Sequence, residues 1–417
     1  ACLCQLLPTS HPPPLFCTVL GEDVSGAALM ASLQQMRLDT SHVRVVQGAT
    51  TPTVLAILDR GGELVSCVAD VQSVEEHLTP AGGLGSLAQD ALPRASLLVC
   101  EANLAPASLQ FLCAAAHASE VPIILEPVSV PKSKRVVGCL PYLTFITPNA
   151  MELVSIAEEV CKQSNKPFVL GPMLSKVQQH AIHGSYADSS SLGDGSNGSS
   201  NGGDLEHLLE ELAQCAAVLL QAGTQHVLVT LGSRGAAIFS CPLRLRGKQQ
   251  GHSSLDLNGH EQARREDGLE VVECVHLPAL PPLGPVVSTS GAGDTLVGGL
   301  AAALLTEGLA CHEPSVAAVE AASEAITASA IGRVGIASLA IPEQQQQQQQ
   351  QQVSLPVGTV LHPSTMRAVA LGMAAATAAI QSPSNVPLGL SLHKLTASAS
   401  GLLNGQTSVH RFRCWAQ

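Results

Sequence analysis

Residues 286–305 read VVSTSGAGDTLVGGLAAALL, in which a β-branched segment passes through two closely spaced glycines into an apolar helical segment. The first N–H groups of a helix have no partner inside the helix, and the helix dipole adds partial positive charge at that end. Gly291 and Gly293 let a ligand approach the backbone closely, because neither carries a side chain. The pattern therefore predicts a turn that binds an anion at the start of a helix.

Asp294 lies in the same turn, and two interpretations of its carboxylate are open. A carboxylate repels a neighbouring anion, so the first interpretation gives Asp294 a functional role that justifies its position. The second makes Asp294 the N-cap of a helix that begins near Thr295. The turn alone does not distinguish them.

The composition indicates a globular protein that handles a small ligand. The chain has 417 residues, a net charge of −12 and 2% aromatic residues, so it lacks the basic and stacking side chains of a nucleic-acid surface. Its 13 cysteines form no CxxC pair, which is typical of a reducing compartment. No apolar run reaches the roughly 18 residues that would span a bilayer. We therefore expect a cytoplasmic protein with a small-molecule partner and without nucleic-acid or membrane partners.

Apolar runs alternate with helical segments from Leu15 onward, which predicts an α/β fold with a mainly parallel sheet. Most of the runs are apolar throughout, as in strands that are buried on both faces. The clearest helix covers residues 204–223, and the last core helix covers residues 364–382. The candidate strands are residues 15–21, 96–102, 121–127, 143–148 and 226–232.

Residues 51–70 break this alternation, because TPTVLAILDRGGELVSCVAD reads as two strands around a turn. We expect this hairpin, within about residues 43–72, to form a lid over the ligand. At the ends of the chain we expect an irregular start at 1–14 and a loosely ordered tail at 393–417. Polar and low-complexity composition predicts disordered insertions at residues 184–203, 242–269 and 344–352.

Two further motifs follow predicted strands. TPNAMEL places Asn149 and Glu152 three residues apart, where an amide and a carboxylate on one helix face could hold hydrated magnesium. The same spacing is that of a capping box, with Asn149 as N-cap and Glu152 three residues later. TLGSRGA places Thr230, Gly232 and Gly235 at the sheet edge where α/β proteins bind ligands, although an ordinary turn has a similar composition.

The order of these motifs resembles the PfkB-type carbohydrate kinases of the ribokinase-like superfamily. VLGEDVSG, the hairpin, TPNAMEL, TLGSRGA and STSGAGDTLVGGL follow one another as in that family, over residues 15–392. The resemblance implies a three-layer α/β/α sandwich with a mainly parallel sheet and an inserted β-hairpin lid. Within the family, TPTVLAILDRGGEL, CEANL and EPVSVPKSKR are most similar to pseudouridine kinases. The family resemblance thus implies phosphorylation of a sugar hydroxyl with ATP and magnesium. The similarity to pseudouridine kinases implies that this hydroxyl is the ribose 5′-hydroxyl of pseudouridine.

The resemblance also implies roles for the residues of the opening turn. The backbone N–H groups of Gly291, Ala292, Gly293 and Asp294 would form an anion hole for the transferring phosphoryl group. The Asp294 carboxylate would be the base that takes the proton of the sugar hydroxyl. Lys132 would contact phosphate or would simply be solvated.

The other two motifs acquire roles in the same way. Asn149 and Glu152 match the family motif N-x-x-E, which organises magnesium and its waters. Thr230, Gly232 and Gly235 match the turn that lines the phosphates and ribose of ATP. Lids in this family also pair between subunits, so the resemblance implies that a homodimer through the hairpin is plausible.

One element of the family pattern is missing before Leu15. Members open with a strand that carries a sugar-binding aspartate, followed by a paired-glycine signature, and residues 1–14 contain neither Asp nor Gly. One alternative is therefore a truncated, catalytically impaired member that binds nucleotide or a partner without turnover. A kinase for another nucleoside or sugar is a second alternative. A Rossmann oxidoreductase, supported only by GLGSLA at residues 83–88, is a third.

Overall fold

The computed structural model describes residues 1–58, 64–182, 201–241, 269–306, 361–382, 386–387, 389–405 and 407–415. Most of the expected insertions, at residues 184–200, 242–268 and 344–352, and the turn of the expected hairpin lie outside these ranges. Residues 201–203 and 269 also fall within the predicted insertions, but they belong to a helix and a strand.

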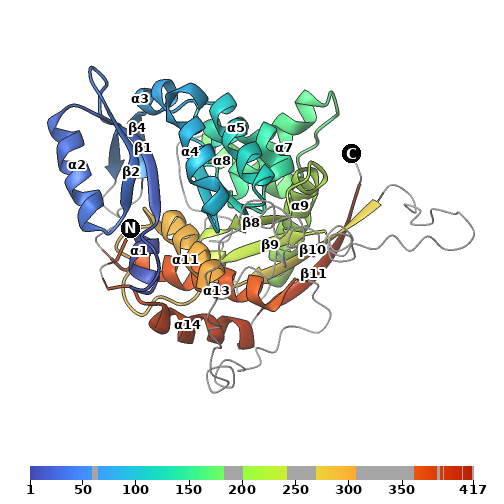
Figure 1. The fold of residues 1–417 in the computed structure, drawn as a ribbon. Coiled ribbons are helices and arrows are strands. Elements are labelled where there is room, and N and C mark those ends of the chain that lie inside the picture. Colours follow the sequence, from blue (N-terminus) through green and yellow to red (C-terminus); the bar gives the residue numbers. More distant parts are fainter. Residues whose placement is uncertain are drawn as a thin grey trace, which may run out of the picture.

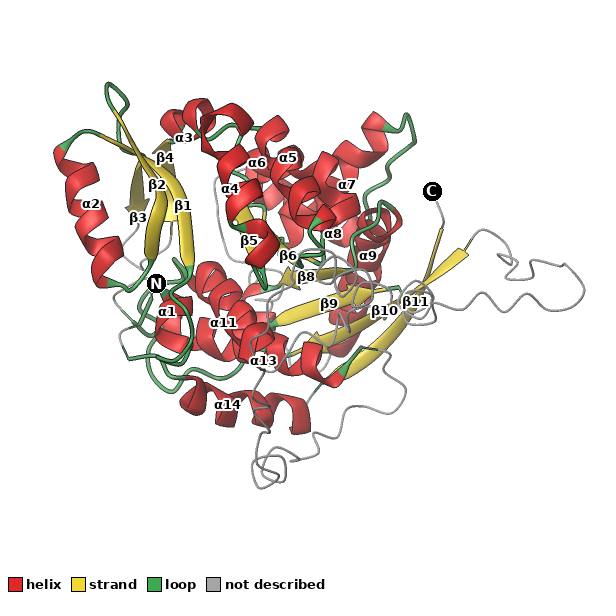
Figure 2. Cartoon of the chain, in the orientation of Figure 1, coloured by secondary structure: helices red, strands yellow, loops and turns green. Residues whose placement is uncertain are grey.

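A seven-stranded sheet forms the centre of the molecule (Figures 1 and 2). Its strand order is β11-β10-β9-β8-β7-β6-β5, parallel from β5 to β8 and antiparallel from β8 to β11. The four parallel strands all fall on strands that the sequence predicts. The bounds are β5 (Leu98–Glu101), β6 (Ile123–Glu126), β7 (Phe145–Ile146), β8 (His226–Thr230), β9 (Ala236–Ser240), β10 (Leu269–Leu277) and β11 (Ser408–Trp415).

Helices cover both faces of this sheet, which confirms the three-layer α/β/α sandwich (Figure 1). One layer contains α5 (Pro106–Ala118), α7 (Ala150–Gln163) and α9 (Asn201–Gln221). The other contains α1 (Cys2–Leu6), α11 (Ala292–Thr306), α13 (Pro363–Ile380) and α14 (Leu392–Gly405). The shorter elements are α3 (Gln72–His77), α4 (Gly85–Asp90), α6 (Val130–Ser133), α8 (Pro172–Ile182), the 3₁₀ segments Leu92–Arg94, Lys134–Tyr142 and Gly232–Arg234, and the π-helical turn Pro80–Leu84.

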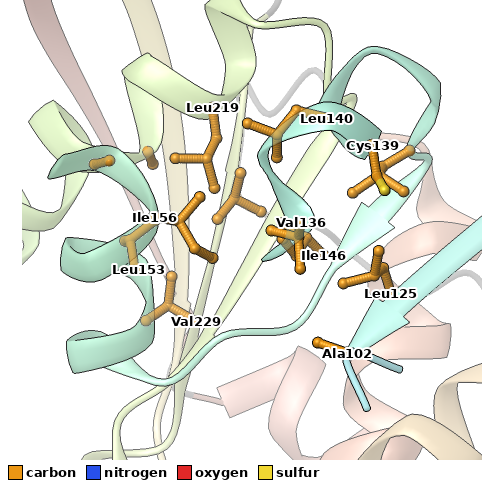
Figure 3. Close-up of a cluster of buried hydrophobic side chains, with 14 of the residues drawn as sticks. Ala102, Leu125, Val136, Cys139, Leu140, Ile146, Leu153, Ile156, Leu219 and Val229 are labelled. Atoms are coloured by element: carbon orange, nitrogen blue, oxygen red, sulfur yellow. The ribbon is translucent and has the colours of Figure 1, made fainter. Parts of the chain in front are cut away.

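Strand side chains alternate between the two layers, as the two-residue period of a strand requires. In β8, Val227 and Val229 face the layer of α7 and α9, whereas Leu228 faces the layer of α11 and α13. All three are fully buried, which explains why the strand is a continuous apolar run in the sequence. Figure 3 shows Val229 in one cluster with Leu153 of α7 and Leu219 of α9.

Two helices of the second layer, α11 and α13, pack closely at small residues. A Cβ atom at Gly299 of α11 would lie 2.9 Å from the Cα atom of Gly372 and 2.9 Å from the Cβ atom of Ala375, both on α13. Only glycine permits this approach of two helices. The contact fixes the axis of α11, and with it the position of its N-terminus.

Residues 15–70 form a smaller unit beside the central sheet (Figure 2). Its first part is a parallel pair of strands, and its second part is the antiparallel hairpin that the sequence predicts. Asp23 joins the two parts, because it caps a helix through the N–H of Gly26 (2.7 Å) and accepts hydrogen bonds from the N–H (2.9 Å) and hydroxyl (2.7 Å) of Thr51. The elements are β1 (Leu15–Gly21), α2 (Val24–Gln35), β2 (Asp39–Val46), β3 (Thr53–Leu58) and β4 (Leu64–Asp70).

Both ends of the chain contain regular structure that the sequence analysis did not predict. The expected irregular start includes α1, which is buried against α11. The expected loosely ordered tail includes α14 and the edge strand β11, so that expectation is wrong for the described residues. The sequence of β11 contains no unbroken apolar run that would predict a buried strand. Cys414 faces the core, whereas Arg411 of the same strand contacts Glu273 of β10 at 3.4 Å.

Candidate active site

The residues predicted to act gather at the carboxyl ends of the parallel strands, opposite the N-terminus of α11. Burial is the main cause of a raised pKa at both Glu101, which ends β5, and Glu126, which ends β6, and the charge of Asp294 adds to both shifts. Asn149, after β7, forms an isolated parallel bridge with Thr230 at the end of β8. Residues far apart in the sequence therefore meet at the sheet edge where α/β proteins bind ligands.

The turn before α11 has the predicted form. Gly291 has a φ of +79°, a left-handed conformation that favours glycine. Its carbonyl accepts hydrogen bonds from the N–H (2.9 Å) and the hydroxyl (2.8 Å) of Thr295, which close the first turn of the helix. The helix begins at Ala292, so the N–H groups of residues 292–294 belong to its positive end.

Asp294 is the third residue of α11, and its exposed side chain accepts no hydrogen bond from the described residues. An N-cap residue precedes the first helical residue, and its side chain accepts a hydrogen bond from the first turn. The interpretation of Asp294 as the cap of a helix that begins near Thr295 is therefore wrong. Its carboxylate is left available to a ligand.

Gly293 is exposed in the same turn. A Cβ atom at this position would meet no atom of the described residues within 4 Å. Packing within this part of the chain therefore does not explain the glycine. Close approach of a ligand to the backbone at Gly293 stays a prediction.

Asn149 and Glu152 form a capping box at the start of α7, so the capping interpretation is confirmed. The Oδ1 atom of Asn149 accepts hydrogen bonds from the N–H groups of Met151 (3.0 Å) and Glu152 (2.9 Å), and the Oε2 atom of Glu152 accepts one from the N–H of Asn149 (2.9 Å). Glu152 is 4% exposed, and burial raises its pKa against the effect of that hydrogen bond. Magnesium binding by the same pair stays a prediction.

The turn after Thr230 contains two left-handed glycines, Gly232 with φ +59° and Gly235 with φ +93°. The N–H of Leu231 donates to the carbonyl of Gly235 at 2.8 Å and closes the turn. A Cβ atom at Gly235 would lie 2.1 Å from the carbonyl oxygen of Leu277, so close packing against the end of β10 already requires glycine there. The predicted contacts of this turn with ATP stay a prediction.

Lys132 lies on α6, and its side chain reaches the part of the site at the end of β5, which we call the β5 side. Its Nζ atom donates to the Oδ1 atom of Asn103, in the loop that follows β5. Burial raises the pKa of Glu101, whereas the hydrogen bond from the N–H of Asn103 (2.8 Å) and the charge of Lys132 lower it. Lys132 is thus hydrogen-bonded and partly buried instead of simply solvated, and its contact with phosphate stays a prediction.

Sequence reasoning missed two carboxyl groups of this edge, Glu101 and Glu126. Each ends an otherwise apolar parallel strand, in the segments CEANL and LEP. The hydroxyl of Thr147, beyond β7, donates to the Oε2 atom of Glu126. A charged residue at the carboxyl end of a buried parallel strand was the signal that would have found both.

The donors at this edge suit a hard cation that is held through water. Asn149 and Glu152 offer amide and carboxylate oxygen atoms, the type of ligand that magnesium prefers, and magnesium usually keeps several of its waters. In the part of the chain that the structure describes, no three His, Cys, Asp or Glu side chains are arranged to hold a metal ion. The residues therefore fit indirect binding and not a cage of protein ligands.

Comparison with solved structures gives the class of fold. Ribokinase from Giardia lamblia has a TM-score of 0.53 at 15% identity, over 96% of this chain and 86% of that one. Ribokinase from Arabidopsis thaliana, solved with ribose and ATP, has a TM-score of 0.50 at 16% identity, over 95% of this chain and 84% of that one. The fold is therefore that of the ribokinase-like kinases.

The family follows from the sequence comparison. The model of the pfkB family carbohydrate kinases matches residues 13–170 and 203–337, which is more than half of the chain. The chain belongs to this family and is a phosphotransferase that acts on a hydroxyl of a sugar or nucleoside. Pseudouridine kinase from Arabidopsis thaliana is 27% identical over 311 residues, 70% of this chain and 72% of that protein. Pseudouridine kinase from Escherichia coli K12 is 25% identical over 144 residues, 34% of this chain and 43% of that protein.

Within the described ranges, no helix combines the length and the apolar character that crossing a bilayer requires.

Proposed function

We propose that the protein transfers the γ-phosphoryl group of ATP to the 5′-hydroxyl of pseudouridine. The observation that carries the proposal is the exposed carboxylate of Asp294, which has no hydrogen bond to the described residues and lies at the positive end of α11. The choice of acceptor is supported by the similarity to the pseudouridine kinase of Arabidopsis thaliana.

Asp294 acts as the general base. The acceptor hydroxyl gives its proton to the carboxylate while its oxygen forms the new bond to phosphorus, and the bond from phosphorus to the bridging oxygen of ADP breaks. The N–H groups of Gly291, Gly293 and Asp294 and the dipole of α11 stabilise the negative charge of the transferring group, and the N–H of Ala292, which donates to the carbonyl of Thr289 at 3.3 Å, joins them when the phosphoryl group replaces that carbonyl. The hydrogen bonds from Thr295 to Gly291 already hold the turn in this form.

The nucleotide and the acceptor lie on opposite sides of Asp294. Thr230, Gly232 and Gly235, at the end of β8, line the ATP side. The acceptor therefore lies on the β5 side, where Lys132 supplies a positive charge and contacts phosphate.

When bound, magnesium neutralises phosphate charge. Of the residues after β7, Asn149 and Glu152 would hold its waters.

The hairpin β3–β4 is the proposed lid and dimer contact. Its strands expose apolar side chains, Val54 (61%), Leu55 (62%), Ile57 (52%) and Val68 (65%). A two-stranded hairpin without further packing is marginally stable in water. Closure over the acceptor and pairing with the hairpin of a second copy would both cover these side chains, which supports a homodimer through the lid.

Transfer of labelled phosphate from ATP tests the proposal, with pseudouridine, uridine and ribose as acceptors. We expect the parent protein to prefer pseudouridine. Asp294→Asn should lower turnover by about 10²- to 10⁴-fold, the usual effect of removing a general base. Its affinity for ATP and its thermal stability should stay close to those of the parent, because Asp294 makes no hydrogen bond with the described residues. The matched control is Asp90→Asn, an exposed aspartate at the end of α4, which should keep the parental rate.

The other outcomes separate the alternatives. A parent that binds ATP but phosphorylates no acceptor would support the nucleotide-binding alternative. Transfer to another sugar or nucleoside alone would replace pseudouridine as the substrate. An Asp294→Asn variant with the parental rate would exclude Asp294 as the base.

A further inference from the structure

Arg135 lies outside the proposed catalytic groups, yet it joins two parts of the molecule. Its Nη1 atom donates to the carbonyl oxygens of three consecutive residues, Ala102 (3.3 Å), Asn103 (3.2 Å) and Leu104 (3.3 Å). The same nitrogen lies 2.8 Å from the Oε1 atom of Glu75. One guanidinium group thus holds the loop after β5 and a carboxylate of α3 together.

The loop that Arg135 holds carries the acceptor side of the site. The N–H of Asn103 donates to the carboxylate of Glu101 at 2.8 Å, and its side-chain oxygen accepts a hydrogen bond from Lys132. The position of this loop therefore sets the positions of both charged groups. Arg135 follows Lys132 by three residues, so it fixes the loop and the segment that bears the lysine to each other.

The carboxylate that Arg135 contacts belongs to a helix that continues directly from the hairpin. β4 ends at Asp70, and α3 begins at Gln72. The side chain of Val74 is buried and holds the helix against the core. A single residue, Val71, connects the helix to the hairpin, so we infer that a displacement of the hairpin changes the position of Glu75. The side chains of the ion pair are 25% exposed for Arg135 and 34% exposed for Glu75. Pairs of this exposure are weak and can form and break as the elements move.

We propose that Arg135 is a positioning residue that couples the hairpin to the acceptor side of the site. In this structure α3 already presents Glu75 to Arg135 at 2.8 Å, and Arg135 in turn fixes the loop that orients Glu101 and Lys132, so a hairpin that moves over the acceptor acts on both charged groups through this pair. The coupling rests on the proposed function, because it acts on the sugar or nucleoside acceptor and not on ATP.

Steady-state kinetics of Glu75→Gln, Arg135→Met and the double variant test this coupling. We expect each single variant to raise KM for the acceptor by roughly 5- to 10-fold and to leave KM for ATP within about 2-fold of the parent. The double variant should be no worse than the worse single variant, since both changes break one linkage. Arg135→Lys keeps the positive charge beside Glu75 but lacks the planar guanidinium, so it should restore part of the loss. The control is Glu159→Gln, which removes an ion pair with Lys162 (3.7 Å) within α7 and should change neither KM.

Hydrogen–deuterium exchange gives a readout that needs no turnover. In Glu75→Gln, amides of the loop at residues 102–104 should exchange faster, although the substitution lies on α3. Unchanged exchange in the loop, or equal changes of both KM values, would overturn the coupling. A parent protein that phosphorylates no acceptor would refute the proposed function, and the exchange experiment would still decide whether Glu75 and the loop are linked.

Discussion

The carboxyl group of Glu126 gives a quantitative test of the site, through the pH dependence of unfolding. Burial raises its pKa to about 8, and the charges of Glu152 and Asp294 add to the effect. The hydrogen bonds from the hydroxyl of Thr147 and the N–H of Val128 oppose the shift without cancelling it. At neutral pH the folded protein therefore carries Glu126 in its protonated form.

The sign follows from comparison with the unfolded chain, where the pKa of a glutamate is 4.5. Below that pH both states hold the proton, and Glu126 has no effect on the pH dependence of folding. As the pH rises from 4.5 towards 8, the unfolded chain releases the proton and the folded protein keeps it, so stability falls. Each pH unit in this range corresponds to about 1.4 kcal/mol, which gives an upper limit of about 5 kcal/mol.

Glu126→Gln removes this titration and keeps the shape of the side chain. Urea unfolding of parent and variant should be measured at pH 5.0, 7.0 and 8.5. The free energy of unfolding of the variant relative to that of the parent should rise by about 2 to 4 kcal/mol between the first and the last pH. Glu159→Gln is the matched control. Glu159 is partly exposed, and the hydrogen bond from Gln163 lowers its pKa, so its contribution changes only at lower pH. A constant difference between Glu126→Gln and the parent at all three pH values would refute the buried, protonated carboxyl.

Two further predictions concern the turn of α11 and the hairpin. Gly293→Val should weaken ATP binding at least 10-fold in calorimetry, because its side chain occupies the space in front of the turn, while stability falls by no more than about 1 kcal/mol. The control is Gly401→Val, a helical glycine that also has no atom within 4 Å of an added Cβ; unchanged ATP affinity in Gly293→Val would contradict the anion site. Sedimentation should show a parental dimer and a monomeric Leu55→Asp/Val68→Asp variant, and a parent that is monomeric at high concentration would exclude the dimer.

The parallel strands were predictable because their surroundings are uniform. β6 and β8 are covered on both faces, so their residues are apolar without a break, as at 123–125 and 227–229. The antiparallel edge was not predictable in this way. Glu273 of β10 is fully buried, and its partner Arg411 lies 138 residues away on β11. A local pattern cannot show that a charge will be buried when the group that compensates it comes from the far end of the chain.

The motifs of the site were visible in the sequence, but their roles depend on positions that differ by a few residues. The cap and base interpretations of Asp294 differ only in where α11 begins. The left-handed conformation of Gly291 places that start at Ala292, three residues before Thr295. The sequence could not distinguish these starts, because glycine, alanine and aspartate are all compatible with either.

The charge state of Glu126 affects the electrostatic repulsion that a phosphate meets when it approaches Asp294. Three carboxyl groups, Glu101, Glu126 and Glu152, lie at the sheet edge that α11 faces, and as ions they would all repel a phosphoryl group. Burial raises the pKa of each of them, and that of Glu126 reaches about 8, so at neutral pH this group is uncharged. Asp294 differs from them because it is exposed, at the positive end of a helix. The protonated form of Glu126 therefore lowers the negative charge around the turn before α11, while the carboxylate that is proposed to take the proton stays at the surface where the substrate arrives.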